Sequence, residues 1–273
     1  MNVIVDSDSI AYQVAGAIGS LIKKGELLED DKDQCLKSAY FMLKAKIKQI
    51  HEDLNANDET HFHFMLSGKK NYRYDLYPEY KANRKDTVKP PYLSEVRDIL
   101  ITKYNAFVTE GIEADDMCGI VPMQSKGEWI IAHIDKDIDT IPGDHYDYMK
   151  RIRYTVSEKQ AVCNLYMQSL TGDTCDNIPG LFKMTGRKCT KKIKEGLTDL
   201  MEIEDINEMN QSMWEYVVEQ FQYTTPEEKE PLIRNLKCLW IQHEEGVIWE
   251  PPGMEEDWGL SEPYDSYTWE PED

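Results

Sequence analysis

The sequence predicts an α/β domain with a mostly parallel central sheet and flanking helices. Along its first half, short apolar runs alternate with longer segments in which apolar residues recur every three or four positions. The run 129–134 is almost entirely apolar, which is typical of a strand that is buried on both faces of a parallel sheet. Alternating strands and helices of this kind favour a layered α/β architecture.

The strands are expected at the short apolar or aromatic runs. Residues 3–5 form the first strand, which ends in Asp6, and residues 61–66 form the second, which Ser67-Gly68 stops. Residues 107–108 form a brief third strand, and 129–134 the fourth.

The helices of this half are indicated by apolar spacing and by a capping residue. In 33–54 the apolar side chains fall on one helical face. Ser94 follows two prolines and is the expected N-cap of a helix over 94–104. Further helices are expected at 10–22 and 115–123.

The second half of the sequence is expected to be mostly helical. Residues 157–170 and 187–221 have helical patterns, and the stretch 172–186 between them is rich in turn residues. No internal repeat is present.

These patterns predict a single domain over residues 1–243. Its α/β part covers 1–156 and includes an arch near 69–92, which we call the arch segment, and its helical part covers 157–243. Residues 244–273 contain eleven acids and no Lys or Arg, and are expected to form a flexible acidic tail.

The composition excludes several classes of protein. With 41% hydrophobic and 10% aromatic residues, the chain of 273 residues is too apolar to be disordered. No apolar run approaches the ~18–20 residues of a membrane span, and no secretory signal is recognisable. The six cysteines are scattered without a CxxC pair, which predicts reduced thiols and a cytoplasmic protein.

The net charge of −20 argues at first against nucleic acid as a partner, since a polyanion repels an acidic protein. However, −11 of that charge comes from residues 244–273, which leaves −9 on residues 1–243. The charge therefore does not exclude a DNA-binding surface on the folded part.

Acidic residues cluster where the expected strands end. Because the carboxyl ends of parallel strands converge at one sheet edge, these carboxylates are expected to meet in one cleft. Crowded carboxylates need cations, and hard oxygen ligands select Mg²⁺ or Mn²⁺. Any one cluster alone is typical of a helix cap, but four of them predict a metal site. The acids are Asp6, Asp8, Glu113, Asp115, Asp116, Asp135, Asp137, Asp173 and Asp176.

Two basic segments accompany the acids. Residues 69–89 have a local charge of +4 and four interleaved tyrosines, and residues 183–194 have six bases and no acid. Basic residues mixed with aromatic ones suit phosphate contacts and base stacking. Either segment alone is typical of a solvated face, whereas beside an acidic cleft the two predict surfaces that bind DNA.

Four motifs in the order of the chain resemble the 5′-nuclease superfamily. They are Tyr80-Lys-Ala-Asn-Arg84, Gly111-Ile-Glu-Ala-Asp-Asp116, Asp135-Lys-Asp137 and Gly172-Asp-Thr-Cys-Asp-Asn-Ile-Pro-Gly180. This superfamily contains bacteriophage 5′→3′ exonucleases, flap endonucleases and the 5′-nuclease domain of DNA polymerase I. The resemblance covers about residues 1–195 and is greatest to the stand-alone phage enzymes.

The resemblance implies a PIN-like fold and an enzyme that hydrolyses DNA at a free 5′ end or 5′ flap with two Mg²⁺ or Mn²⁺ ions. It implies that Lys81 and Arg84 contact the scissile phosphate and that Tyr80 stacks on a terminal base. The first metal falls to Asp6, Glu113, Asp115 and Asp116, with Asp135 and Asp137 near it, and the second to Asp137, Asp173 and Asp176. Further DNA contacts fall to Arg73 and Lys85, and to the helix–turn–helix variant with Lys183, Arg187, Lys188, Lys191 and Lys192.

Two departures from the family pattern affect these expectations. Ser67 stands where the family usually has an Asp at the end of the second strand, so one carboxylate is missing unless Asp8 or a water replaces it. The loop 181–186 is bulkier than the family's glycine-rich loop, which argues against the monovalent cation that the family holds there.

Two other functions remain open at this stage. Asp6-Ser-Asp8 after an apolar strand also fits a haloacid-dehalogenase-type phosphatase, in which Asp6 would be phosphorylated. The serine at position 67 also fits a DNA-junction-binding protein of weak or absent activity. The expected protein is a monomer in the cytoplasm, in the host's if phage-encoded, and its tail is a candidate contact for a replication protein.

Overall fold

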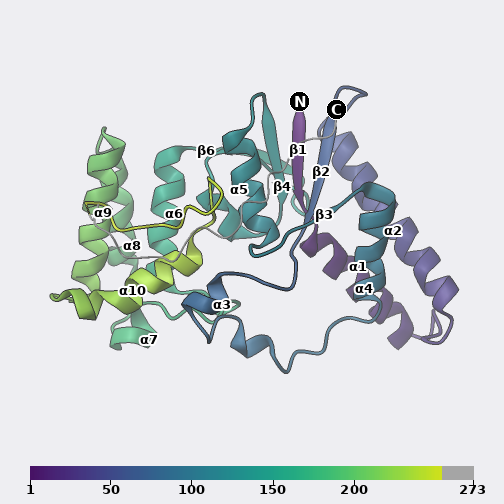
Figure 1. Ribbon diagram of the computed structural model, residues 1–273, viewed down its shortest axis with the longest axis horizontal. Coiled ribbons are helices and arrows are strands. Elements are labelled where there is room, and N and C mark those ends of the chain that lie inside the picture. The colour runs from purple at the N-terminus through teal and green to yellow at the C-terminus, as the bar shows by residue number, and fades with distance from the viewer. Residues whose placement is uncertain (254–273) are drawn as a thin grey trace.

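The computed structural model describes residues 1–253 and contains a six-stranded sheet (Figure 1). The strand order is β3-β2-β1-β4-β5-β6, in which the first five strands are parallel and β6 is antiparallel to β5. The strands are β1 (Asn2–Asp6), β2 (His61–Leu66), β3 (Phe107–Val108), β4 (Trp129–His133), β5 (Gly143–Asp147) and β6 (Ile152–Val156). The predicted α/β class with a mostly parallel sheet is confirmed.

The central strands are apolar because helices cover both faces of the sheet. Val3 and Val5 pack into one core with three helices, whereas Ile4 between them packs into a second core with α5. The helices on the first face are α1 (Asp8–Lys23), α2 (Lys32–Asp53) and α4 (Leu93–Tyr104), and α5 is Ala114–Gln124 (Figure 1). This is the two-sided burial that the continuous apolar run of β4 predicts.

Helix α4 begins differently from the prediction. The residue at its N-cap is Tyr92, in the left-handed conformation with φ 61°, and Ser94 lies inside the helix. The Ser94 hydroxyl donates to the carboxylate of Glu95, and no side chain accepts a hydrogen bond at the cap of this helix. The predicted cap at Ser94 is therefore wrong.

Two other elements were not predicted. The hairpin of β5 and β6 ends the sheet, with β6 as the edge strand, and polar residues such as Asp144 and Arg153 interrupt its apolar pattern. Helix α10 (Pro226–Leu239) begins at a capping box made by Thr225 and Glu228. This capping box is the sequence feature that indicates the start of the helix, whose first turn is highly charged.

The helical part has a core of its own. It consists of α6 (Glu158–Thr171), α7 (Leu181–Thr185), α8 (Lys191–Asp199), the 3₁₀ turn η3 (Leu200–Glu202), α9 (Ile206–Phe221) and α10 (Figure 1). Ser157 caps α6 and Thr190 caps α8 through their side chains. Helices α7 and α8, joined by residues 186–190, occupy the position of the expected helix–turn–helix variant.

The expected tail contributes Trp249 to this helical core. Trp249 is buried and its ring meets those of Tyr166 and Trp214 edge to face. Lys237 forms an ion pair with Glu250 at 2.6 Å. The rest of the expected tail, 254–273, lies outside the described residues.

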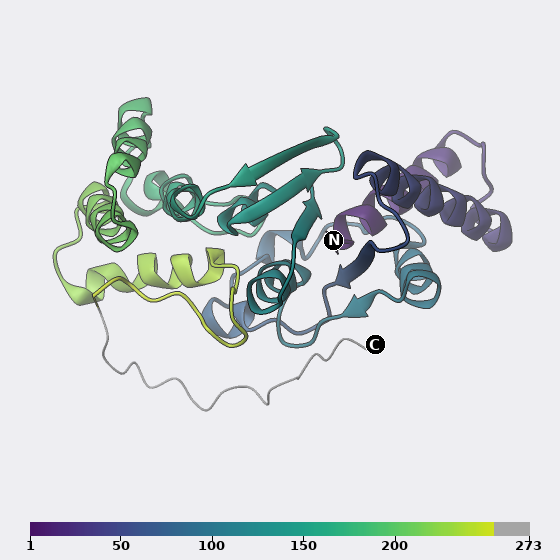
Figure 2. The same ribbon diagram turned by 90° about the horizontal axis from the view of Figure 1, so that it is seen from above.

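The arch segment connects β2 to α4 with little regular structure (Figures 1 and 2). It contains α3 (Arg73–Leu76) and the 3₁₀ turn η1 (Ala82–Arg84). In Figure 1 the carboxyl ends of β1 and β2 point toward the side on which this segment runs. None of the helices within residues 1–253 is both long and apolar enough to cross a membrane.

Candidate active site

Three carboxylates gather where β1, β4 and α5 meet, and we call Asp6, Asp115 and Asp135 the carboxylate edge. Asp6 ends β1, Asp135 follows β4, and these two strands are parallel neighbours. Asp115 lies in the first turn of α5, which packs on β1. The topology thus brings Asp6 together with two acids that follow it by more than 100 residues in the sequence.

The carboxylate edge is electrostatically unfavourable by itself. Burial, followed by the charges of Asp8 and Asp135, raises the pKa of Asp6 to about 7. Burial, with the charges of Asp6 and Glu113, holds the pKa of Asp115 well above its usual range. Among residues 1–253, no basic side chain forms an ion pair with a member of the edge. A cation bound here would relieve this repulsion, so the donor set fits a hard divalent ion.

Glu113 lies beside this edge but is neutralised by the arch segment. Its carboxylate pairs with the ammonium of Lys81 and lies 3.7 Å from Arg73 Nη1. Although burial opposes the effect, the charges of Lys81 and Arg73 lower the pKa of Glu113 to about 2. Lys81 also approaches Asp176 Oδ2 at 3.6 Å, so one lysine links two of the expected metal ligands.

Tyr80 joins the same two acids, and this corrects its expected role. Its hydroxyl lies 2.7 Å from both Glu113 Oε2 and Asp176 Oδ2. The hydroxyl has one hydrogen and so donates to one of these carboxylates at a time. Tyr80 is 2% exposed and its ring packs against Tyr74. The buried ring has no free face for the predicted base stacking.

Asp137 and Asp173 share a lysine. Lys136 Nζ lies 2.6 Å from Asp137 Oδ1 and 3.0 Å from Asp173 Oδ2. Burial, with the charge of Asp135, raises the pKa of Asp137 to about 7. Asp173 also accepts hydrogen bonds from the N–H groups of Cys175 and Asp176, at 2.6 and 2.9 Å. The structure thus brings Asp137 and Asp173 together, around an ammonium that lies on a largely exposed side chain.

Asp116 and Arg73 form a buried ion pair, which corrects both expectations. Two guanidinium nitrogens of Arg73 donate to the two carboxylate oxygens of Asp116 at 2.7 and 2.8 Å. Arg73 is 2% and Asp116 0% exposed. Asp116 also accepts from the N–H groups of Glu113 and Gln242. The expected phosphate contact by Arg73 and metal ligation by Asp116 are wrong, because each satisfies the other inside the protein.

The position of the missing carboxylate is held by a polar network. Ser67 Oγ accepts from the N–H of Ala114 at 2.9 Å, at the start of α5. Asp8, the possible replacement, pairs with Arg97 and accepts from Ser67 N at 2.8 Å. Asp8 is thus held by Arg97 and by the backbone of Ser67, the residue at the position of the missing ligand.

The arch segment is fastened to the loop that carries Asp173 and Asp176. Lys81 N donates to Asp176 O at 2.9 Å, and Arg84 donates to Cys175 O at 2.9 Å and to Asp176 Oδ1 at 2.6 Å. Within this loop Gly172 has φ +72°, and a Cβ there would lie 2.4 Å from Gly180 N. Lys85 follows η1 and is exposed.

The basic residues of the helical part lie apart from the carboxylate edge, on and between α7 and α8 (Figure 1). Lys183, Lys188, Lys191 and Lys192 are exposed, as phosphate contacts require. Arg187 is half-buried and its guanidinium donates to the Gln220 carbonyl, so it holds the turn against α9.

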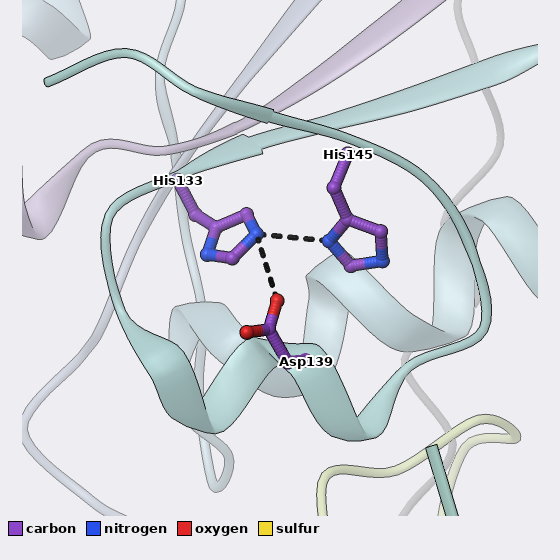
Figure 3. Close-up of side chains that lie close together, drawn as sticks. All are labelled: His133, Asp139 and His145. Carbon is purple, nitrogen blue, oxygen red and sulfur yellow. Dashed lines mark hydrogen bonds and ion pairs between the residues drawn. The ribbon is translucent and has the colours of Figure 1, made fainter. Parts of the chain in front are cut away.

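One cluster was missed by the sequence reasoning. His133, Asp139 and His145 lie close together beside β4 and β5 (Figure 3). The sequence gives little indication of this cluster, because its histidines have neither HxxH nor HxH spacing. The three residues are simply spaced six positions apart.

A mostly parallel sheet with carboxylates at the carboxyl ends of its strands defines a class of α/β proteins that bind ligands at that edge. The family model for the 5′-3′ exonuclease N-terminal resolvase-like domain matches residues 1–167, and the chain belongs to this family. The predicted relationship to the 5′-nuclease superfamily is thereby confirmed.

Curated relatives agree with this assignment. The chain is 26% identical over 218 residues to DNA polymerase I of Bacillus caldotenax (71% of this chain, 23% of that protein) and 24% over 247 residues to DNA polymerase I of Bacillus subtilis (80% and 26%). A 5′-3′ exonuclease of Buchnera aphidicola is 28% identical over 158 residues (50% and 54%). The chain thus spans about a quarter of the length of the two polymerases.

Two T5 structures share the fold at 17% identity. A T5 protein co-crystallized with metal ions superposes with a TM-score of 0.55, covering 87% of this chain and 88% of the T5 chain. A lysine-to-alanine mutant of the T5 5′-exonuclease gives 0.50, covering 87% and 86%.

Proposed function

We propose that this chain is a divalent-metal-dependent 5′→3′ exonuclease and flap endonuclease that hydrolyses DNA phosphodiester bonds at 5′ ends. The observation that carries the proposal is the carboxylate edge: three acids without a basic partner in residues 1–253, at the sheet edge that faces the arch segment. Membership of the 5′-3′ exonuclease family supports it.

Asp6, Asp115 and Asp135 would hold a divalent ion, with Glu113 next to them. A second position would fall to Asp137, Asp173 and Asp176. When bound, Mg²⁺ or Mn²⁺ supplies an activated water and stabilises the leaving oxygen. The ion would also lower the pKa of Asp6 and Asp115, because it favours their charged forms.

Lys81 and Arg84 would position the scissile phosphate and stabilise its developing charge. Both now pair with carboxylates, Lys81 with Glu113 and Arg84 with Asp176. A phosphate that binds between Lys81 and Arg84 would replace the carboxylates that now pair with them. Each of the two cations would therefore keep an anionic partner when the substrate binds.

The duplex beyond the cleaved bond would lie on the helix–turn–helix variant. Lys183, Lys188, Lys191 and Lys192 would contact its phosphates, and Lys85 would add a contact from the arch segment. We propose residues 1–243 as one nuclease unit that acts as a monomer, with residues 244–253 packed on it.

The test uses a 5′-flap substrate and a blunt duplex, each labelled at either end, with Mg²⁺, with Mn²⁺ and with EDTA. We expect short products from the 5′ end in the presence of either metal and none in EDTA. Binding of both substrates without any metal-dependent product would instead establish a junction-binding protein. Asp115→Asn serves as the inactive control.

A further inference from the structure

The histidine cluster beside β4 and β5 lies outside the carboxylate edge and has no part in the proposed nuclease mechanism. His133 ends β4, His145 lies in β5, and Asp139 lies in the 3₁₀ turn η2 (Lys136–Thr140) between them (Figure 3). Both imidazoles are buried, at 1% and 0% exposure. His133 Nε2 lies 2.8 Å from His145 Nδ1 and 3.8 Å from Asp139 Oδ1.

The outer nitrogens of the two rings fix their tautomers. His133 Nδ1 lies 2.7 Å from the carbonyl oxygen of Asp135, and His145 Nε2 lies 2.9 Å from that of Ile141. A carbonyl oxygen can only accept, so both outer nitrogens must carry a hydrogen. The inner nitrogens, His133 Nε2 and His145 Nδ1, are therefore the two lone-pair sites, and they face each other.

Two lone pairs and a carboxylate thus converge on one point. The short distance between the inner nitrogens requires a hydrogen between them, which gives the pair of rings one positive charge next to Asp139. One ligand atom from each of the three residues lies within 4.8 Å of the other two, so the donor set fits a cation.

We propose that His133, Asp139 and His145 bind one divalent transition-metal ion of the Zn²⁺ type. Both imidazoles would ligate as neutral rings, with Asp139 as the third donor and a water as the fourth. Binding would release the one shared proton to solvent. Imidazole donors suit Zn²⁺ or Co²⁺ and not Mg²⁺, which distinguishes this site from the carboxylate edge.

The surroundings of the cluster match those of a metal centre. Metal-bound histidines donate their second N–H to a carbonyl or carboxylate, as both rings do here. Tyr154 donates to Asp139 Oδ1 at 2.7 Å and so orients the carboxylate. Ligand nitrogens around Zn²⁺ are about 3.3 Å apart in a tetrahedron with Zn–N bonds of about 2.05 Å, so the two rings need to separate by roughly half an ångström.

The ion would brace the segment that carries two of the candidate nuclease residues. Its ligands come from β4, η2 and β5, and the segment between His133 and His145 contains Asp135 and Asp137. His133 also donates to the carbonyl of Asp135 itself. The site would act as a structural clamp at this end of the sheet, whether or not the chain cleaves DNA.

The test is a titration of the full chain with Co²⁺ in excess Mg²⁺, which occupies the carboxylate edge. We expect one Co²⁺ per chain with the intense visible absorption of a four-coordinate site, and displacement by one equivalent of Zn²⁺. His145→Gln should remove the absorption, and Tyr154→Phe should weaken Co²⁺ binding by about 10-fold. His61→Gln, at an exposed histidine, should leave the titration unchanged.

A second measurement does not depend on a variant. Imidazole ¹⁵N resonances of the wild-type chain should show two rings, and only two, whose inner nitrogens shift when Zn²⁺ is added. Absence of the absorption band in the wild type, an unchanged band in a folded His145→Gln variant, or shifts at other histidines would each overturn the proposal.

Discussion

The acids beside the arch segment and the acids of the carboxylate edge differ in what neutralises them. On the arch side each carboxylate has a cation of the chain: Asp116 has Arg73, Glu113 has Lys81, and Asp176 has Arg84. The carboxylate edge has none within the described residues, and the pKa values of Asp6 and Asp115 are raised. The acids of the carboxylate edge, which have no ion pair, are therefore the strongest candidates for binding a metal ion, whereas a metal at Asp176 or Glu113 would have to compete with a basic side chain.

Removing Arg73, the buried cation on the arch side, should have the largest effect on the free energy of unfolding. Arg73→Ala leaves Asp116 as an unpaired buried charge, which costs about 3–5 kcal/mol in the free energy of unfolding. Urea unfolding measures it. Arg84→Ala breaks a pair whose guanidinium is half-exposed and should cost no more than about 1 kcal/mol. Equal losses in the two variants would contradict the distinction between a buried and an exposed pair.

Neutralising an acid of the carboxylate edge should reduce cleavage without reducing the stability of the metal-free chain. Asp115→Asn removes a repelled charge, so the metal-free chain should become no less stable, while cleavage in Mg²⁺ falls by about 10²–10³-fold and DNA binding persists. Asp135→Asn should behave in the same way. Single-turnover cleavage and thermal unfolding measure the two effects. Asp58→Asn, at an exposed turn, is the control, and an active Asp135→Asn variant would refute the ligand assignment.

Lys81 lies between the arch side and the carboxylate edge, and its substitution tests whether it acts in cleavage or in binding. Lys81→Ala should lower the single-turnover rate by about 10²-fold, since a cation at the phosphate is lost, and should change the dissociation constant for DNA far less. Lys44→Ala, at an exposed position of α2 outside both basic segments, should change neither. A Lys81→Ala variant that loses affinity and rate in equal measure would make this lysine a binding residue.

The metal-free chain should also lose stability as the pH rises. The pKa of Asp6 and that of Asp137 lie at about 7 in the folded chain, against 3.8 for an ordinary Asp. Groups with raised pKa values contribute stability that is complete below about pH 4 and lost as the pH rises through about 7. In EDTA, the melting temperature should fall between pH 5 and pH 8, roughly, and Mg²⁺ should reverse the fall. A melting temperature that rises over this range would contradict the assignment.

The smallest effect is expected on the helical part. Lys191→Gln should weaken DNA binding modestly and reduce the slope of log K against log[salt] by about one, because one phosphate contact is lost. Lys44→Gln, at an exposed position of α2, should leave the slope unchanged. Fluorescence anisotropy at several salt concentrations distinguishes the two variants.

The sequence was sufficient for elements with a strong apolar pattern. β1, β2 and β4 and the helices α1, α2 and α6 lie within a few residues of the predicted ranges. β5 and β6 escaped prediction because neither has an uninterrupted apolar run. Ser94 was misplaced because Tyr92, in the left-handed conformation, is the N-cap of α4.

For the site, the sequence predicted which acids matter but not their partners. Arg73 and Asp116 both lie in motifs that carry charge, and only the fold reveals that they pair with each other 43 positions apart. Tyr80 failed for the same reason: a tyrosine in a basic segment reads as exposed, whereas its ring is buried in the helical core. Long-range pairing of this kind leaves no periodic trace in a sequence.

The pair of Arg73 and Asp116 also bears on when the chain can finish folding during its synthesis. Arg73 donates to the carbonyls of Cys238 and Trp240, 165 and 167 positions further along the chain, and Asp116 accepts from Gln242. Contacts of such separation form late, since a long loop must close first. During synthesis, α5 and its acids would therefore remain without their final support until the ribosome has released nearly all of the folded part. The timing of translation thus limits when the carboxylate edge takes its final shape.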